Sequence, residues 1–448
     1  MGKLPDRTAR AINALPGELL PAVAGFALFL CLFGGYFMLR PIRDALGIQS
    51  GVDNLQWLFT ATFMLMLVAV PLFGWLNSVV PRTQFVDWVY GLFALNLVGF
   101  AVAFALGNDS VLLARFFYVW ISVYNLFVVS VAWSLMADVF DSAQARRLFA
   151  FIAAGASVGG LLGPMASALL VNVLGHAGLV LLSGFLLLLT LTLKRYLMAW
   201  RATGGAGRPG AVPNESPQRP VPGNPFSGIT RVLRSPYLLA ICLFVVLLAT
   251  TSTFLYFEQA RQVAERFPTR EEQVRVFGLI DFAVQAGALA SQLFITGRLA
   301  QRFGLGSLLV VVPGLVCAGF IGLALAPGFA MLAGLMVVRR IGEYAFIRPG
   351  REMLFASLDA ETKYKAKNFI DTVVYRAGDA ISGWAKSLLD LLNQGAVLAA
   401  IVGALCAGLW AFTGWFLARQ SGHAGGAAKA PNDRDQQPDS QRAPPRDR

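Results

Sequence analysis

The chain has 448 residues, of which 56% are hydrophobic and only 14% carry a charge. A soluble domain is nearer half apolar and about a quarter charged. The net charge of +12 could indicate a nucleic-acid partner, but the basic residues lie in short segments between long apolar blocks. That distribution is the one that orients membrane proteins. We therefore exclude a soluble protein and a nucleic-acid partner, and we expect a multi-pass protein embedded in the lipid bilayer.

Apolar blocks long enough to cross a bilayer recur along the whole chain. A membrane helix needs about 20 consecutive apolar residues, and about 12 such blocks can be drawn, which predicts an all-α polytopic membrane protein. The predicted spans are 19–39, 55–76, 84–106, 111–136, 148–174, 177–198, 236–257, 276–297, 305–326, 329–350, 368–391 and 395–418.

Lys and Arg gather near the N-terminus and after the even-numbered spans, which predicts that both termini are cytoplasmic. The segment 201–227 is rich in Pro, Gly and Arg, which favours a flexible linker. The expected organisation is a six-helix bundle over 1–198, a cytoplasmic linker over 199–235, a second six-helix bundle over 236–418 and a disordered cytoplasmic tail over 419–448. Arg40 and Arg43 contradict the charge rule, because they follow span 1 on the predicted outer side.

Six plus six spans with both ends inside is the plan of the major facilitator superfamily, in which two bundles rock about a site near the membrane midplane. The segment GRLAQRFG, 297–304, resembles the short Gly-x-Leu-x-x-Arg-x-Gly loop of that superfamily, where glycines permit a tight turn. Span 5 carries Gly155, Gly159 and Gly163 at four-residue spacing. This stripe favours close helix packing, with a hinge for rocking as the alternative.

Charged residues within or beside the predicted spans are the main functional signal, because a charge in hydrocarbon is costly and should face a cavity or a partner. The cations in these regions are Arg40, Arg43, Arg115, Arg339, Arg340, Arg348, Arg351, Arg376 and Lys386. They outnumber the anions, and guanidinium groups bind carboxylate or phosphate in bidentate fashion. The pattern predicts an anionic substrate. The structural alternative is that these side chains snorkel to the interface or form internal ion pairs.

Three stretches resemble the ATP:ADP antiporter family of nucleotide transporters. LRPIRDAL (39–46) is similar to the family's Leu-Arg-x-x-Lys-Asp, with Arg43 at the position of a functional lysine. YAFIRPGREMLFASLD (344–359) is similar to Tyr-x-x-x-Asp-Pro-x-Lys-Glu-Met, and KYKAKNFIDTVVYRAGD (363–379) to Lys-x-Lys-x-Lys-x-x-Ile-Asp. ARRLFAFIAAGASVGG (145–160) is a looser match. The resemblance implies nucleotide transport, ATP binding and antiport.

Two charges are reversed relative to that family. Arg348 stands where the family has an aspartate, and Asp379 stands where it has a lysine important for transport. An acidic residue expected in span 4 is replaced by a stripe that offers Ser122 and Asn125. The resemblance therefore implies transport more firmly than it implies a nucleotide as the substrate.

We expect a secondary active transporter that moves an anionic solute, such as a nucleotide or another phosphorylated metabolite, by alternating access. The expected substrate-binding residues are Arg40, Arg43, Arg348, Arg351, Arg376 and Asn125. The expected coupling or ion-pair residues are Asp44, Asp281, Glu343 and Asp379. The alternatives are a proton-coupled transporter of a non-nucleotide compound and a non-transporting membrane scaffold of the same fold.

Signatures of enzymes and metal sites are missing from the sequence. It contains no HExxH or P-loop motif. It has only two histidines, and its four cysteines fall in different apolar blocks. We therefore expect no enzymatic activity, no cofactor and no metal. We also expect a monomer in the inner membrane of a bacterium.

Overall fold

The computed structural model describes residues 14–15, 17–80, 82–107, 110–203, 227–356, 358, 360–392 and 395–427. These residues form helices and turns, with no strand among them. The predicted linker lies outside the described residues over 204–226, and the predicted tail over 428–448.

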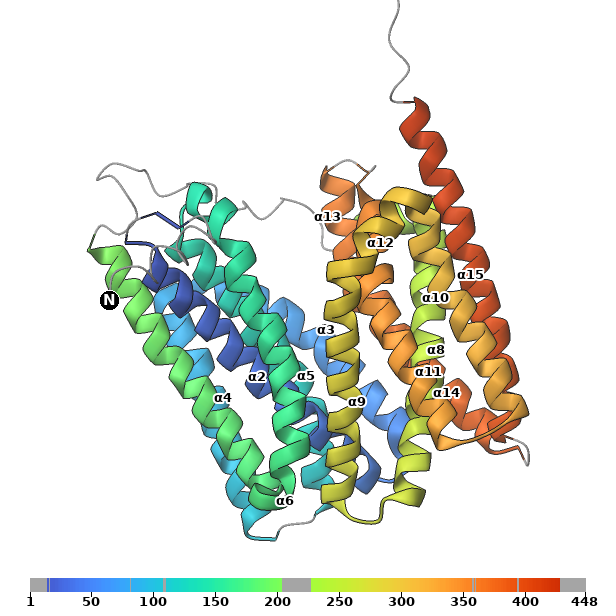
Figure 1. Ribbon diagram of the computed structural model, residues 1–448, viewed down its shortest axis with the longest axis horizontal. Helices are drawn as coiled ribbons and strands as arrows, with labels where there is room; N and C mark the ends of the chain where they lie inside the picture. Colours follow the sequence, from blue (N-terminus) through green and yellow to red (C-terminus); the bar gives the residue numbers. More distant parts are fainter. Residues whose placement is uncertain are drawn as a thin grey trace, which may run out of the picture.

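Helices from the N-terminal part of the chain form one side of the molecule (Figure 1). They are α2 (Leu19–Gln49), α3 (Leu55–Val79), α4 (Arg82–Ala105), α5 (Val111–Val139) and α6 (Ser142–Ala202). A continuous core of buried aliphatic and aromatic side chains joins them, with Leu28, Tyr90 and Tyr124 almost fully enclosed. We call this group the N-half.

Helices from the C-terminal part form the other side and have a core of their own (Figure 1). They are α7 (Ser227–Arg234), α8 (Pro236–Arg266), α9 (Arg270–Ser291), α10 (Gly297–Leu325), α11 (Phe329–Gly342), α12 (Arg348–Phe355), α13 (Ala360–Phe369), α14 (Tyr375–Asp390) and α15 (Gly395–Ala427). Single π-helical turns over Gln292–Thr296, Glu343–Ile347 and Ile370–Val374 join α9 to α10, α11 to α12 and α13 to α14. We call this group the C-half.

Eight stretches of the described residues are long and apolar enough to cross a membrane. Two of them, Ser142–Ala202 and Arg270–Leu325, have 61 and 56 residues. At about 1.5 Å per residue, each is long enough for two crossings. Two further helical segments, 329–355 and 360–390, carry more charges and correspond to the predicted spans 329–350 and 368–391. Each of the twelve predicted spans therefore has a helical counterpart, and the predicted all-α polytopic fold is confirmed.

Two glycines break the long helices where the sequence predicts boundaries between spans. Gly175 has φ 63° and falls between predicted spans 5 and 6, and Gly304 has φ 70° at the end of the GRLAQRFG segment. Such positive φ values favour glycine, because a Cβ atom would be strained there. Gly297, at the start of the segment, is helical instead.

Several predicted boundaries are wrong. The helix that begins as span 1 continues to Gln49, so Arg40, Pro41 and Arg43 lie inside α2 and not beyond its end. The charged segment 258–275, which lies between the predicted spans 236–257 and 276–297, is helical apart from 267–269. Within the predicted linker, 227–234 is helical as α7, and α15 extends into the predicted tail as far as Ala427.

Candidate functional site

A cavity of about 700 Å³ lies between the N-half and the C-half. Its walls come from α2, α3 and α5 on one side and from α8, α9 and the segment from α11 to α14 on the other. All ten predicted site residues line it: Arg40, Arg43, Asp44, Asn125, Asp281, Glu343, Arg348, Arg351, Arg376 and Asp379. The structure thus gathers residues from distant parts of the sequence, while their individual roles stay predictions.

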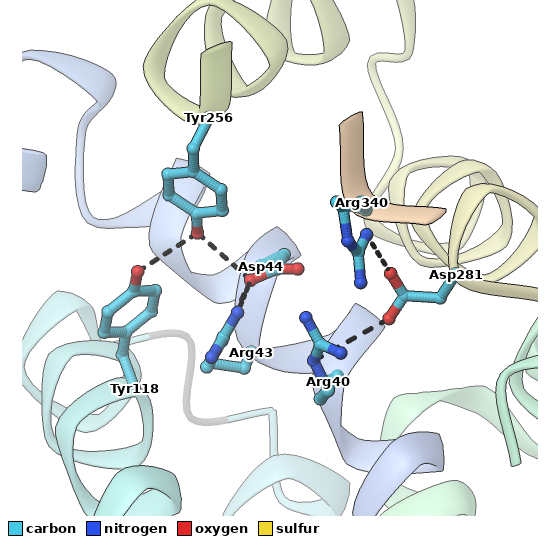
Figure 2. Close-up of polar contacts among 7 residues, drawn as sticks. All are labelled: Arg40, Arg43, Asp44, Tyr118, Tyr256, Asp281 and Arg340. Carbon is cyan, nitrogen blue, oxygen red and sulfur yellow. Dashed lines mark hydrogen bonds and ion pairs between the residues drawn. The ribbon is translucent and has the colours of Figure 1, made fainter. Parts of the chain in front are cut away.

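One ion cluster in the wall of the cavity joins the two halves (Figure 2). Asp281, on α9, lies with its Oδ1 2.5 Å from Nη1 of Arg340, on α11. Its Oδ2 lies 3.8 Å from Nε of Arg40, which belongs to α2. The side chain of Asp281 is 3% exposed, so its charge is balanced by these two cations and not by water. We call Arg40, Asp281 and Arg340 the bridging cluster.

A second polar group beside it also crosses between the halves (Figure 2). Arg43 donates from Nε and Nη2 to Oδ1 of Asp44, at 2.9 and 2.6 Å. The Tyr256 hydroxyl, from α8, donates to the same oxygen at 3.0 Å and accepts from the Tyr118 hydroxyl at 3.1 Å. The Arg43 guanidinium also lies 5.3 Å from the centre of the Tyr118 ring. Arg43 is therefore already paired with the residue that follows it.

A π-helical turn builds the third group, which lies wholly in the C-half. Glu343 accepts from Nη1 of Arg339 at 3.0 Å, at the ordinary helical spacing of four residues. It also accepts from Nη2 of Arg348 at 3.4 Å, five residues further along. The π turn over Glu343–Ile347 makes this second contact natural, because residues five apart are neighbours in a π-helix. The Arg348 guanidinium lies 4.4 Å from the centre of the Tyr344 ring.

The remaining charged residues of the wall form simple pairs. Arg351 lies 3.0 Å from Asp371, and Arg376 lies 3.8 Å from Asp379. The Thr253 hydroxyl donates to Asp379 at 3.4 Å. Asp379 thus has one distant cation, in contrast to the two cations around Asp281 and around Glu343.

The surplus of positive charge is much smaller than the sequence predicts. Among the described residues, the cavity is lined by seven arginines and six carboxylate residues. Arg115 does not line it and donates instead to the backbone oxygen of Ser50 at 3.3 Å. Lys386 is also elsewhere, 2% exposed and paired with Asp390. The sequence prediction counted these two cations and overlooked Asp371 and Glu352.

The N-half lines its side of the cavity largely with aromatic and uncharged polar groups. This wall contains Phe33, Tyr36, Phe37, Phe59, Thr62, Tyr118, Ser122, Asn125 and Val129. The prediction from the sequence named only Asn125 of this set as a binding residue. The spacing of one helix face is followed by Phe33, Tyr36, Phe37 and Arg40. This spacing in the sequence could have identified the α2 part of the cavity wall.

The cavity is accessible from the end of the molecule where α2 begins and α15 ends (Figure 1). The Arg348 and Glu352 side chains, at that end, are 57% and 52% exposed. At the opposite end the halves touch, since Trp384 Nε1 donates to Thr60 Oγ1 at 3.1 Å and Arg270 donates to Gln49 at 2.9 Å.

Comparison with known proteins gives a family and a fold. Residues 22–349 match the family described as Major Facilitator Superfamily. The ADP,ATP carrier protein 1 of Chlamydia muridarum is 28% identical over 184 residues, which cover 37% of this chain and 34% of that protein. The protein of the same name from Chlamydia trachomatis has the same identity and coverage. The chain therefore aligns with only about a third of the length of these relatives.

Solved transporter structures share the architecture across most of the chain. A bacterial homologue of the iron transporter ferroportin, in an inward-facing state, has a TM-score of 0.61 at 16% identity, covering 89% of this chain and 99% of that one. The nucleoside transporter NupG has a TM-score of 0.59 at 13% identity, covering 90% and 99%. At such low identity the likeness shows the fold alone.

Proposed function

We propose that this membrane transporter, which belongs to the Major Facilitator Superfamily through the match of residues 22–349, moves an anionic solute by alternating access. The observation that carries the proposal is the cavity of about 700 Å³ between the halves, with seven guanidinium groups in its wall. Guanidinium forks match the planar geometry of carboxylate and phosphate oxygens. A negative solute would therefore find hydrogen-bond donors in the wall of the cavity.

The contacts between the halves suggest how access alternates. If both termini are cytoplasmic, as the basic residues predict, the cavity faces the cytoplasm. The contacts from Arg40 to Asp281 and from Asp44 to Tyr256 then lie toward the closed outer end. Opening outward requires that these contacts break while the cytoplasmic end closes. A solute promotes the change only if it binds one arrangement more tightly than the other.

For the solute itself we propose a nucleotide or another phosphorylated metabolite, taken up by exchange. Two observations support this choice: the partial similarity to carriers named for ADP and ATP, and the pairing of an aromatic wall with guanidinium groups. Aromatic side chains can stack on a planar ring while arginines hold phosphate.

We further propose that the chain works as a monomer in the bacterial inner membrane, with the segments 1–198 and 236–418 moving as two bodies.

Transport by protein reconstituted in liposomes tests the proposal. Liposomes preloaded with unlabelled nucleotides or sugar phosphates should take up the labelled compound. Arg43→Ala should reduce uptake at least about tenfold, because the cavity loses one positive charge and the buried Asp44 carboxylate loses its partner. Arg115→Ala is the matched control, because Arg115 is an arginine of the same half outside the cavity. If no phosphorylated compound moves and Arg43→Ala changes no uptake, the assignment to anionic solutes is wrong.

A second candidate, proton-coupled transport, is favoured by Asp379. Asp281 and Glu343 are each held between two guanidinium groups, whereas Asp379 has only Arg376 at 3.8 Å. Asp379 is therefore the carboxylate of the three best suited to gain and release a proton, which ionisable residues within membrane spans often do. Uptake should then respond to an imposed pH gradient, and Asp379→Asn should abolish the response. Uptake that ignores the gradient excludes this candidate.

A further inference from the structure

The balance of charges in the cavity limits the charge of the solute. We propose that the transported solute carries one or two negative charges, as a carboxylate or a phosphate monoester does, and not the larger charge of a nucleoside di- or triphosphate. A phosphate monoester carries about −1.5 to −2 at pH 7. The inference rests on the proposed function and narrows its substrate class.

The charged side chains that line the cavity do not cancel one another. Seven arginines and six carboxylate residues line the cavity in the described part of the chain, which leaves a net charge of +1. One of the carboxylates, Glu352, lies 2.6 Å from Lys367, a cation outside the cavity wall. With that neighbour included, the net charge is +2. A solute with one or two negative charges neutralises this field.

The positive charge is concentrated in two places. Arg43, Arg351 and Arg376 each face one carboxylate in the pairs described above. In the bridging cluster, and in the group around Glu343, one carboxylate is ion-paired with two guanidinium groups. Each of these two groups therefore carries one uncompensated positive charge. The excess of +2 lies in them and not in the simple pairs.

The bridging cluster has hydrogen-bond donors to spare. Arg40 Nε and Arg340 Nη2 are buried and make no hydrogen bond within the part of the chain that the structure describes. Arg340 is only 7% exposed. The 3.8 Å separation between Arg40 Nε and Asp281 is longer than a hydrogen bond, so an anionic oxygen can take up this donor without breaking one. We place the anionic group of the solute on Arg40 and Arg340.

A third or fourth negative charge has no such place. It would have to displace Asp44 or Asp379 from its own arginine, and a buried carboxylate deprived of its partner is strongly destabilising. An uncompensated charge at close range in a site of effective dielectric near 20 should weaken binding at least about tenfold.

Two series of probes separate charge from molecular shape. The first is inorganic phosphate, pyrophosphate and tripolyphosphate, and the second is the mono-, di- and triphosphate of one nucleoside. Binding to the full-length protein is measured by thermal shift and by competition for labelled monophosphate. In each series the monophosphate should bind at least about tenfold more tightly than the triphosphate, by the reasoning above.

Asp281→Asn sharpens the test, because it adds one unit of positive charge to the cavity with little change of shape. It should move the ratio of diphosphate to monophosphate affinity toward the diphosphate by about tenfold. Asp390→Asn is the matched control, since Asp390 is ion-paired with Lys386 outside the cavity. The ratio of diphosphate to monophosphate affinity of this variant should equal that of the unmodified protein. Glu343→Gln makes the same prediction if Asp281→Asn does not fold.

The outcomes distinguish this inference from the function on which it rests. Tighter binding of triphosphates than of monophosphates by the unmodified protein overturns the inference and leaves anion transport standing. The same holds if Asp281→Asn and Glu343→Gln both fold and keep the original ratio. If folded protein binds no member of either series, the proposed transport of a phosphorylated solute fails together with the inference.

Discussion

The glycine stripe of α6 allows a sharp test of how the N-half is built. Gly159 faces the backbone of α2, and a Cβ atom added there would lie 2.5 Å from the Leu30 oxygen and 2.7 Å from the Gly34 nitrogen. Gly155 and Gly163 meet the same helix, with added Cβ atoms 2.1 and 2.4 Å from backbone oxygens. Because both helices belong to the N-half, the stripe supports the packing interpretation over a hinge between the halves.

The magnitude follows from these distances. At Gly159 the added atom falls about 1 Å short of ordinary contact, and its neighbours are backbone atoms that cannot rotate away. The two helices must separate, at an overpacking cost of about 1–3 kcal/mol. The better helix propensity of alanine returns up to about 1 kcal/mol. We expect Gly159→Ala to lower the free energy of unfolding by about 2 kcal/mol, which is the upper overpacking cost less the gain in helix propensity.

Unfolding in sodium dodecyl sulfate, followed by circular dichroism, measures the effect. Gly99→Ala is the control, since Gly99 lies within α4 of the same half and has no atom within 4 Å of an added Cβ. That variant should be as stable as the unmodified protein or slightly more so. If the two variants unfold at the same detergent concentration, α2 and α6 do not approach as closely as described here, and the reasoning is wrong.

Three further predictions concern polar contacts. Arg147 donates a hydrogen bond to the Glu18 carboxylate and lowers the pKa of that carboxylate below the usual 4.5. The contact therefore stabilises the fold above that pH and is lost on acidification. Glu18→Gln should make the melting temperature fall less steeply as the pH is lowered. Asp390→Asn removes the charged partner of the buried Lys386, and it should lower the free energy of unfolding in detergent by about 3–5 kcal/mol. The purified folded variant should still prefer the same ligands. Tyr256→Phe should increase the labelling of a cysteine introduced at the closed end of the cavity, because a link between the halves is lost. Unchanged labelling would contradict this.

The sequence by itself determined the class of protein and the existence and order of its helices, but not where several of them end. Apolar blocks separated by basic segments are a local property of the chain, and a membrane leaves helices as one of few ways to satisfy the backbone. The breaks at Gly175 and Gly304 were equally local, since a glycine at positive φ needs no distant partner. The gathering of ten charged and polar residues around one cavity followed from the cost of leaving charges in lipid.

The tertiary structure alone decided how the charges are paired. Arg40 meets Asp281 and Tyr256 meets Asp44 across the two halves, and no spacing within one helix encodes such contacts. The π turn at Glu343 placed Arg348 one residue beyond the usual helical neighbour, so a helical wheel could not reveal that pair. Tertiary packing also made the excess of cations in the cavity smaller than the sequence predicts. A charge count along the sequence sums residues that share a span, whereas the cavity sums only those that face each other, and long-range packing selects which ones do.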